Sequence, residues 1–252
     1  MGLKKSVDVK PASGKLGVLM PGMGAVATTF IAGVLAIRRG LAKPIGSLAE
    51  YGTIRLGKRT DNRVPSIRDY VSLAALDDLV FGGWDIFTDN CYEAATRAGV
   101  LESSLLEKVK DELAAIQPMP AVFEQAYVKK LSGPNVKKGK SKMDLAEQLM
   151  EDIKRFKQHN GCDRLVMIWC ASTEVYRQPT DVHSSLAKFE DGLRRSDENI
   201  APSQIYAYAA AKLGIPYANG APNLSLETPA ISALARETRT PIAGKEIGRA
   251  HV

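Results

Sequence analysis

The sequence is poor in the side chains that build disulfides and metal centres. Its 252 residues include only three cysteines and three histidines. The cysteines, Cys91, Cys162 and Cys170, are odd in number and form no C-x-x-C pair. Such spacing argues against a disulfide framework and a zinc site and is typical of reduced thiols in a cytosolic protein. We therefore expect a cytoplasmic protein without a bound metal ion.

Several catalytic motifs are missing as well. The sequence has no G-x-S-x-G, H-E-x-x-H or G-K-[ST] motif and no kinase motif set. None of the histidines, His159, His183 and His251, makes a convincing triad with serine and aspartate. Serine-hydrolase, zinc-protease and P-loop chemistry therefore have no support in this sequence.

Long apolar runs and a strong charge bias are also lacking. The most apolar helical stretch is interrupted by Arg38 and Arg39 and is too short to span a bilayer. Residues 1–14 are basic but contain no apolar signal core, so we expect a flexible leader. The net charge of +6 and the pI of about 9.1 favour small anionic ligands. Because the basic residues are dispersed, we expect a soluble protein that binds neither nucleic acid nor membrane.

The most informative stretch is a glycine-rich turn between an apolar run and a helix. Leu16–Met20 reads as a buried strand, and residues 25–39 read as a helix. Gly22 and Gly24 lie between these two segments, and Ala27 lies in the first turn of the expected helix. Together they fit the dinucleotide-binding spacing G-x-G-x-x-G/A. The first helical N–H groups would then face a diphosphate with the positive end of the helix dipole. A tight turn without a ligand remains the alternative.

One part of that fingerprint is displaced in this sequence. No Asp or Glu stands about 20 residues after the glycines to hold a ribose; the first acid is Glu50. Asp85, just after the Gly82-Gly83 break in the strand-like run Leu79–Ile86, is a candidate for this role. Its alternative role is that of a helix N-cap or a turn residue.

Strand-like and helix-like segments alternate along the chain. This alternation predicts an α/β fold of Rossmann-like type, with a mostly parallel sheet and helices on both faces. The expected strands are Leu16–Met20, Tyr51–Leu56, Leu79–Ile86, Arg164–Cys170, Ile215–Ala218 and Pro241–Ala243. The expected helices include 89–98, 103–116, 144–158, 183–193, 204–213 and 228–236. Polar residues follow several strands, which indicates a nicotinamide-binding domain whose reaction the residues leave open.

Seven blocks together resemble a known family. They are LMPGMGAVATTFIAGV (19–34), GTIRLGKRTDNR (52–63), FGGWDIF (81–87), IWCASTEVY (168–176), IAPSQIYAYAA (200–210), YANGAPN (217–223) and TPIAGKE (240–246). In this order they resemble the amino-terminal portion of bacterial-type myo-inositol-1-phosphate synthase, also called inositol-3-phosphate synthase. The resemblance covers about Lys15 to Glu246.

The resemblance implies an NAD-dependent isomerase of inositol and phospholipid biosynthesis. Such an enzyme converts D-glucose 6-phosphate to 1L-myo-inositol 1-phosphate by oxidation, enolisation, intramolecular aldol closure and reduction. The cofactor is regenerated within the cycle, and the full-length enzyme is expected to be a homotetramer. Two other functions stay open: a nucleotide-binding module without chemistry, and a simple NAD-dependent sugar-phosphate dehydrogenase.

The resemblance also assigns cofactor-binding residues by position. The residues of the pyrophosphate turn are Gly22, Gly24, Ala25, Val26 and Thr28. Asp85 corresponds to the acid on the adenosine ribose, and Ser172 and Thr173 to the polar pair near the nicotinamide. The positions expected to line the cofactor and substrate cleft are Asn219, Gly244 and Glu246.

The resemblance ends abruptly at the carboxyl end of the sequence. The family continues with F-K-T-G-Q-T, whereas this chain continues from Glu246 with IGRAHV. We expect the catalytic lysines, the tetramer-forming domain and the returning segment to lie beyond Glu246, so that 15–246 is an incomplete NAD-binding domain. We expect 247–252 to be non-native, because EIGRAHV matches the translation of a common sequencing adapter. Such a chain should bind NAD weakly and catalyse nothing.

Overall fold

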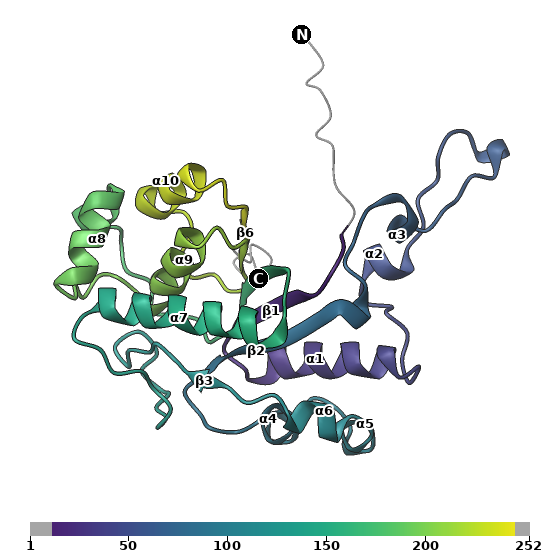
Figure 1. Cartoon of the computed structure of the whole chain (residues 1–252), viewed down its shortest axis with the longest axis horizontal. Helices are drawn as coiled ribbons and strands as arrows, with labels where there is room; N and C mark the ends of the chain where they lie inside the picture. The colour runs from purple at the N-terminus through teal and green to yellow at the C-terminus, as the bar shows by residue number, and fades with distance from the viewer. Residues whose placement is uncertain (1–11, 245–252) are drawn as a thin grey trace, which may run out of the picture.

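A computed structural model describes residues 12–244 of the chain (Figure 1). Its centre is a sheet of six strands, in which every neighbouring pair is parallel and the order is β3-β2-β1-β4-β5-β6. The strands are β1 (Leu16–Pro21), β2 (Leu79–Asp85), β3 (Met119–Pro120), β4 (Arg164–Trp169), β5 (Tyr217–Asn219) and β6 (Ile242–Gly244). The predicted Rossmann-like sheet is confirmed, since this is the strand order of dinucleotide-binding domains.

Helices cover both faces of the sheet, as the alternating pattern predicts. One face is covered by α1 (Ala25–Arg38), α4 (Cys91–Ala98), α5 (Ser103–Lys108) and α6 (Lys110–Ala114). The other face is covered by α7 (Lys142–Asn160), α8 (Leu186–Arg194), α9 (Pro202–Lys212) and α10 (Pro229–Glu237). The central strand β1 supplies both cores, because Val18 and Met20 point to the first face and Leu19 to the second. A strand buried on both faces reads as a continuous apolar run.

The segment between α1 and β2 departs from the sequence-based expectation. Tyr51–Leu56, which we expected to be a strand, begins at the end of the short helix α2 (Leu48–Tyr51) and adds nothing to the sheet. It pairs with its own returning chain, since Ile54 N donates to Pro65 O over 3.0 Å. This segment, residues 39–78 and called the arm below, also contains α3 (Ile67–Tyr70) and extends away from the sheet in Figure 1. The arm therefore separates β1 from β2 by far more sequence than a short crossover does.

Two expected helices also differ in detail. The expected helix 103–116 is divided at Val109, whose φ of −119° and ψ of 18° interrupt the regular turn between α5 and α6. The expected helix 183–193 begins later, because Ser185 caps α8 by accepting a hydrogen bond from Lys188 N. A short 3-10 turn, Asp181–His183, precedes it. These changes do not alter the predicted parallel sheet with helices on both faces.

A buried polar contact fixes the end of β2 against α7. The indole Nε1 of Trp84 donates to Asp152 Oδ2 over 2.8 Å, and Lys137 Nζ lies 2.7 Å from the same oxygen. Asp152 is buried, so this ion pair is shielded from solvent. The contact holds the backbone that leads directly into Asp85.

Candidate functional site

The glycine loop, residues 21–24, follows β1 between the ends of β2 and β4. Gly22 has a φ of +85°, and a Cβ there would lie 2.3 Å from the Cα of Ala171. Its N–H donates to Trp84 O over 2.8 Å, while Cys170 N donates to Pro21 O over 2.9 Å. Only glycine meets both the backbone conformation and the close approach. The predicted tight turn at Gly22 is therefore present.

The amino-terminal end of α1 is open to an anionic ligand. Gly24 is its N-cap, no side chain caps the helix, and its first turn contains no acidic residue. A Cβ at Gly24 would meet nothing within 4 Å, so space remains beside the backbone. Helix N-terminal N–H groups with the positive end of the dipole attract phosphate. The loop and the first turn of α1 therefore contain no acidic residue of their own that would compete with such a ligand.

Asp85 ends β2 and contacts the glycine loop directly. Its Oδ2 accepts a hydrogen bond from Met23 N over 2.7 Å, and its Oδ1 accepts one from Phe87 N over 3.0 Å. Burial raises the pKa of Asp85, although these backbone hydrogen bonds lower it. Asp85 therefore braces the glycine loop from the end of β2. Its role as the acid that holds the ribose stays a prediction.

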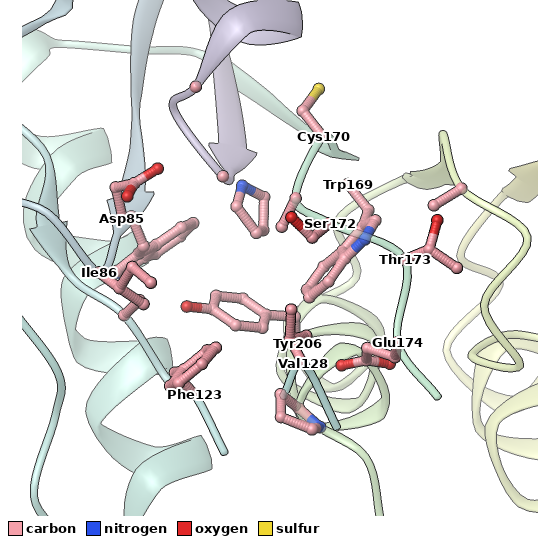
Figure 2. A pocket seen from close by; sticks show the side chains of 18 of the residues that line it. Asp85, Ile86, Phe123, Val128, Trp169, Cys170, Ser172, Thr173, Glu174 and Tyr206 are labelled. Carbon is pink, nitrogen blue, oxygen red and sulfur yellow. The ribbon is translucent and has the colours of Figure 1, made fainter. Parts of the chain in front are cut away.

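A cavity of about 530 Å³ joins these features at the carboxyl ends of the strands. Figure 2 shows Asp85 on one side of it and Ser172 and Thr173 on the segment that leaves β4 on the other. Its described lining residues include no lysine, arginine or histidine. The lining consists of Pro21, Gly22, Gly24, Ala25, Val26, Trp84, Asp85, Ile86, Phe87, Ala121, Val122, Phe123, Val128, Leu131, Ile168, Trp169, Cys170, Ala171, Ser172, Thr173, Glu174, Pro202, Tyr206, Gly220, Ala221 and Pro222. Ligands of open parallel sheets bind at this edge.

Most of the sequence-predicted cofactor residues meet in this cavity. Those that line it are Gly22, Gly24, Ala25, Val26, Asp85, Ser172 and Thr173. Their assigned contacts with the cofactor stay predictions. Glu246 lies outside the described residues, as do 1–11 of the expected leader and the expected tail 247–252.

Three predicted residues lie outside the cavity lining. Thr28 is fully buried, and its hydroxyl donates back to Gly24 O over 2.9 Å, so the hydroxyl does not face the phosphate position. Asn219 is buried and its Nδ2 donates to Asn223 O over 2.9 Å. Gly244 pairs with Asn219 across β5 and β6, and a Cβ at Gly244 would lie 2.2 Å from Asn219 O. In this structure all three serve the framework around the cavity.

An aromatic cluster in the cavity was not predicted. The ring of Tyr206, from α9, lies 5.4 Å from that of Trp84 and 5.6 Å from that of Trp169, both in edge-to-face geometry. Tyr206 also accepts a hydrogen bond from Val122 N through its hydroxyl. Burial raises the pKa of Tyr206 far above its ordinary value of 10.0, so the phenol stays neutral. These rings form a rigid apolar wall that stabilises the arrangement of three distant segments.

Glu174 is the most deeply buried acid in the lining. Burial raises its pKa from 4.5 to about 7, although hydrogen bonds from the Ser203 side chain and backbone lower it. Glu124 and Lys142 act on it from a distance, the first raising and the second lowering the pKa. The carboxyl therefore retains its proton to a higher pH than a solvent-exposed glutamate does.

The raised pKa of Glu174 predicts a pH-dependent stability. A carboxyl whose folded pKa exceeds its unfolded value of 4.5 stabilises the fold fully below that pH, and this contribution is lost as the pH rises through about 7. Glu174→Gln cannot titrate, so relative to the unchanged chain it should gain up to about 3 kcal/mol between about pH 4.5 and pH 8. Urea unfolding at both pH values measures this. Glu151→Gln, at a solvent-exposed carboxyl, should show no such gain.

The strand order, the glycine loop and the acid after β2 together define a dinucleotide-binding domain of Rossmann type. A family model for an NAD-binding domain, described as myo-inositol-1-phosphate synthase, matches residues 16–248. The chain belongs to this family.

Individual relatives agree with the family model. Inositol-3-phosphate synthase 1 of Bacteroides thetaiotaomicron is 48% identical over 241 residues, which are 95% of this chain and 56% of the relative. Inositol-3-phosphate synthase 1 of Oryza sativa subsp. japonica is 31% identical, covering 92% of this chain and 48% of the relative. A crystal structure of inositol-3-phosphate synthase from Caenorhabditis elegans matches with a TM-score of 0.86 and 27% identity, over 92% of this chain and 48% of that one. The chain thus spans about half the length of these relatives.

The described residues contain neither a metal-binding cluster nor a membrane-spanning helix. Within 12–244, no three or more His, Cys, Asp or Glu side chains are grouped so as to hold a metal ion. None of the helices in this range is long and apolar enough to cross a membrane.

Proposed function

We propose that the cavity binds NAD in one extended orientation. The pyrophosphate lies over Gly22 and Gly24 at the start of α1, the adenosine ribose contacts Asp85, and the nicotinamide end lies near Ser172 and Thr173. The observation that carries this proposal is that the uncapped end of α1 opens onto the same cavity as the Asp85 carboxylate and the segment after β4. An anionic diphosphate and a ribose diol complement these groups chemically.

We propose that an enzyme containing this domain isomerises D-glucose 6-phosphate to 1L-myo-inositol 1-phosphate. The 48% identity to the Bacteroides enzyme supports this assignment. Bound NAD supplies the hydride acceptor and, once reduced, the hydride donor. The residues of this chain orient the cofactor: Asp85 fixes the ribose, and Ser172 and Thr173 offer hydroxyl groups at the far end. We further propose a cytoplasmic homotetramer for that protein, with 15–246 as its NAD-binding domain.

The charges of the cavity lining show which groups for substrate binding this lining does not supply. No lining residue in the described range can neutralise a phosphate or donate a proton from a cationic group. Asp85 and Glu174 are the acids of the lining, and both would repel a sugar phosphate when ionised. The cations for glucose 6-phosphate must therefore come from outside this lining.

We expect the 252-residue chain to bind NAD but to leave glucose 6-phosphate unchanged, because the part of the cavity lining that the structure describes lacks those cations. Calorimetry with NAD and a phosphate-release assay for inositol phosphate measure the two properties. The Bacteroides enzyme, assayed in parallel, is the positive control for turnover. Formation of inositol phosphate by the chain would contradict the claim that the cations for glucose 6-phosphate come from outside this lining. Net accumulation of NADH would instead indicate a sugar-phosphate dehydrogenase.

A further inference from the structure

The segment after β4 carries three polar side chains with different surroundings. Ser172 and Thr173 are exposed and line the cavity, whereas the next residue, Glu174, is only 7% exposed (Figure 2). An acid buried so deeply needs hydrogen-bond donors to remain in place. Its partners show what fixes this segment.

The carboxyl of Glu174 lies at the first turn of α9. Its Oε1 accepts from Ser203 N over 2.9 Å, and its Oε2 accepts from the Ser203 hydroxyl. α9 has no side-chain cap of the usual kind, because its N-cap position is held by Ala201. Glu174 thus supplies from a distant loop the acceptor that a capping side chain provides locally.

The backbone of Glu174 is anchored on the other side. Its N–H donates to Asn223 Oδ1 over 2.9 Å, and the carbonyl of Asn223 in turn accepts from Asn219 Nδ2 over 2.9 Å. Asn219 is the last residue of β5. The segment after β4 is therefore held between α9 and the loop that leaves β5.

We propose that Glu174 is a positioning residue that holds Ser172 and Thr173 in place for the nicotinamide half of NAD. The proposal rests on the orientation of NAD proposed above. Glu174 itself points to α9 through its carboxyl, so it acts through the two residues before it. Removal of the carboxyl takes away one of the two anchors of this segment, whereas the Asp85 side chain keeps its hydrogen bonds from Met23 N and Phe87 N.

Comparison of NAD with ADP tests this proposal, because ADP contains the adenosine and diphosphate but lacks the nicotinamide half. In calorimetry on the whole chain, Glu174→Ala should weaken NAD binding about tenfold and change ADP binding by less than about twofold. Glu174→Gln should restore NAD binding, since its amide oxygen accepts from Ser203 N and its amide N–H2 can donate to the hydroxyl. A residue with only a general structural role would affect both ligands equally.

Two other variants keep the test decisive if Glu174→Ala does not fold. Ser203→Ala removes the hydroxyl donor from outside the cavity lining and should weaken NAD binding about threefold, with ADP unaffected. Glu151→Ala, at an exposed carboxyl on α7, should change neither affinity. Equal losses for NAD and ADP, or no loss for NAD in either Glu174→Ala or Ser203→Ala, would overturn the positioning role. If the unchanged chain binds neither ligand, the proposed NAD site itself is wrong.

Discussion

Gly22→Ala should lower the stability of the domain far more than the same substitution at Gly24. The substitution places a Cβ 2.3 Å from the Cα of Ala171 and forces an alanine to a φ of +85°. Backbone strain and the clash together should lower the free energy of unfolding by about 4 kcal/mol. Urea or thermal unfolding measures this loss, and NAD binding should disappear with the fold.

Gly24→Ala is the matched control, because the same change two residues later meets different surroundings. A Cβ at Gly24 has no neighbour within 4 Å, and its φ of −84° is negative, although its ψ of −149° lies outside the main allowed regions. We expect a smaller loss of stability than at Gly22, because there is no clash, and a decrease in NAD affinity of about tenfold or more, since the methyl group occupies the space of the diphosphate. If Gly24→Ala binds NAD as tightly as the unchanged chain, the diphosphate does not lie over the glycine loop.

The contrast between these glycines shows how far sequence reasoning reaches. The spacing of Gly22, Gly24 and Ala27 predicted both the turn and its place after β1, because few residues satisfy such backbone constraints. The alternation of strands and helices predicted the parallel sheet for a similar reason, since buried parallel strands read as apolar runs. Features set by local backbone geometry are therefore readable without coordinates.

Side-chain direction around the cavity was harder to predict. Thr28 stands at a sequence position that the family assigns to the pyrophosphate turn. In the structure, however, Thr28, Ile31 and Leu35 share the buried face of α1. This helical spacing was a signal that the hydroxyl turns toward the sheet and bonds to the carbonyl four residues before it. Asn219 gave no such signal, because a side chain at a strand end can face either the ligand or its own loop.

Contacts between distant segments were not accessible from the sequence. Tyr206 joins Trp84 and Trp169 only because α9 packs across two strands, and no local pattern records that packing. The same holds for Glu174, whose partner Ser203 is 29 residues away. The arm shows a prediction that was wrong: the expected strand Tyr51–Leu56 is not a strand, and Thr53 in it forms an isolated antiparallel bridge to Ser66.

Asp85→Asn should weaken NAD binding about 100-fold. The amide retains the shape of the side chain but loses the charge that strengthens hydrogen bonds to the ribose hydroxyls. It also loses one acceptor, so either Met23 N or Phe87 N is left without its present partner. Calorimetry with NAD measures the affinity. Asp89→Asn, at a carboxylate that pairs with Arg97 outside the cavity lining, is the control and should bind NAD normally.

Affinity for NAD alone does not separate the two roles of Asp85, because a loosened glycine loop would also weaken binding. The ratio of NAD to NADP affinity does separate them. A carboxylate that accepts from the 2′-hydroxyl repels the 2′-phosphate of NADP, so the unchanged chain should prefer NAD and Asp85→Asn should lose most of that preference. Loosening of the loop affects the shared diphosphate and leaves the ratio unchanged. If the preference survives in Asp85→Asn, this acid braces the loop and does not contact the ribose.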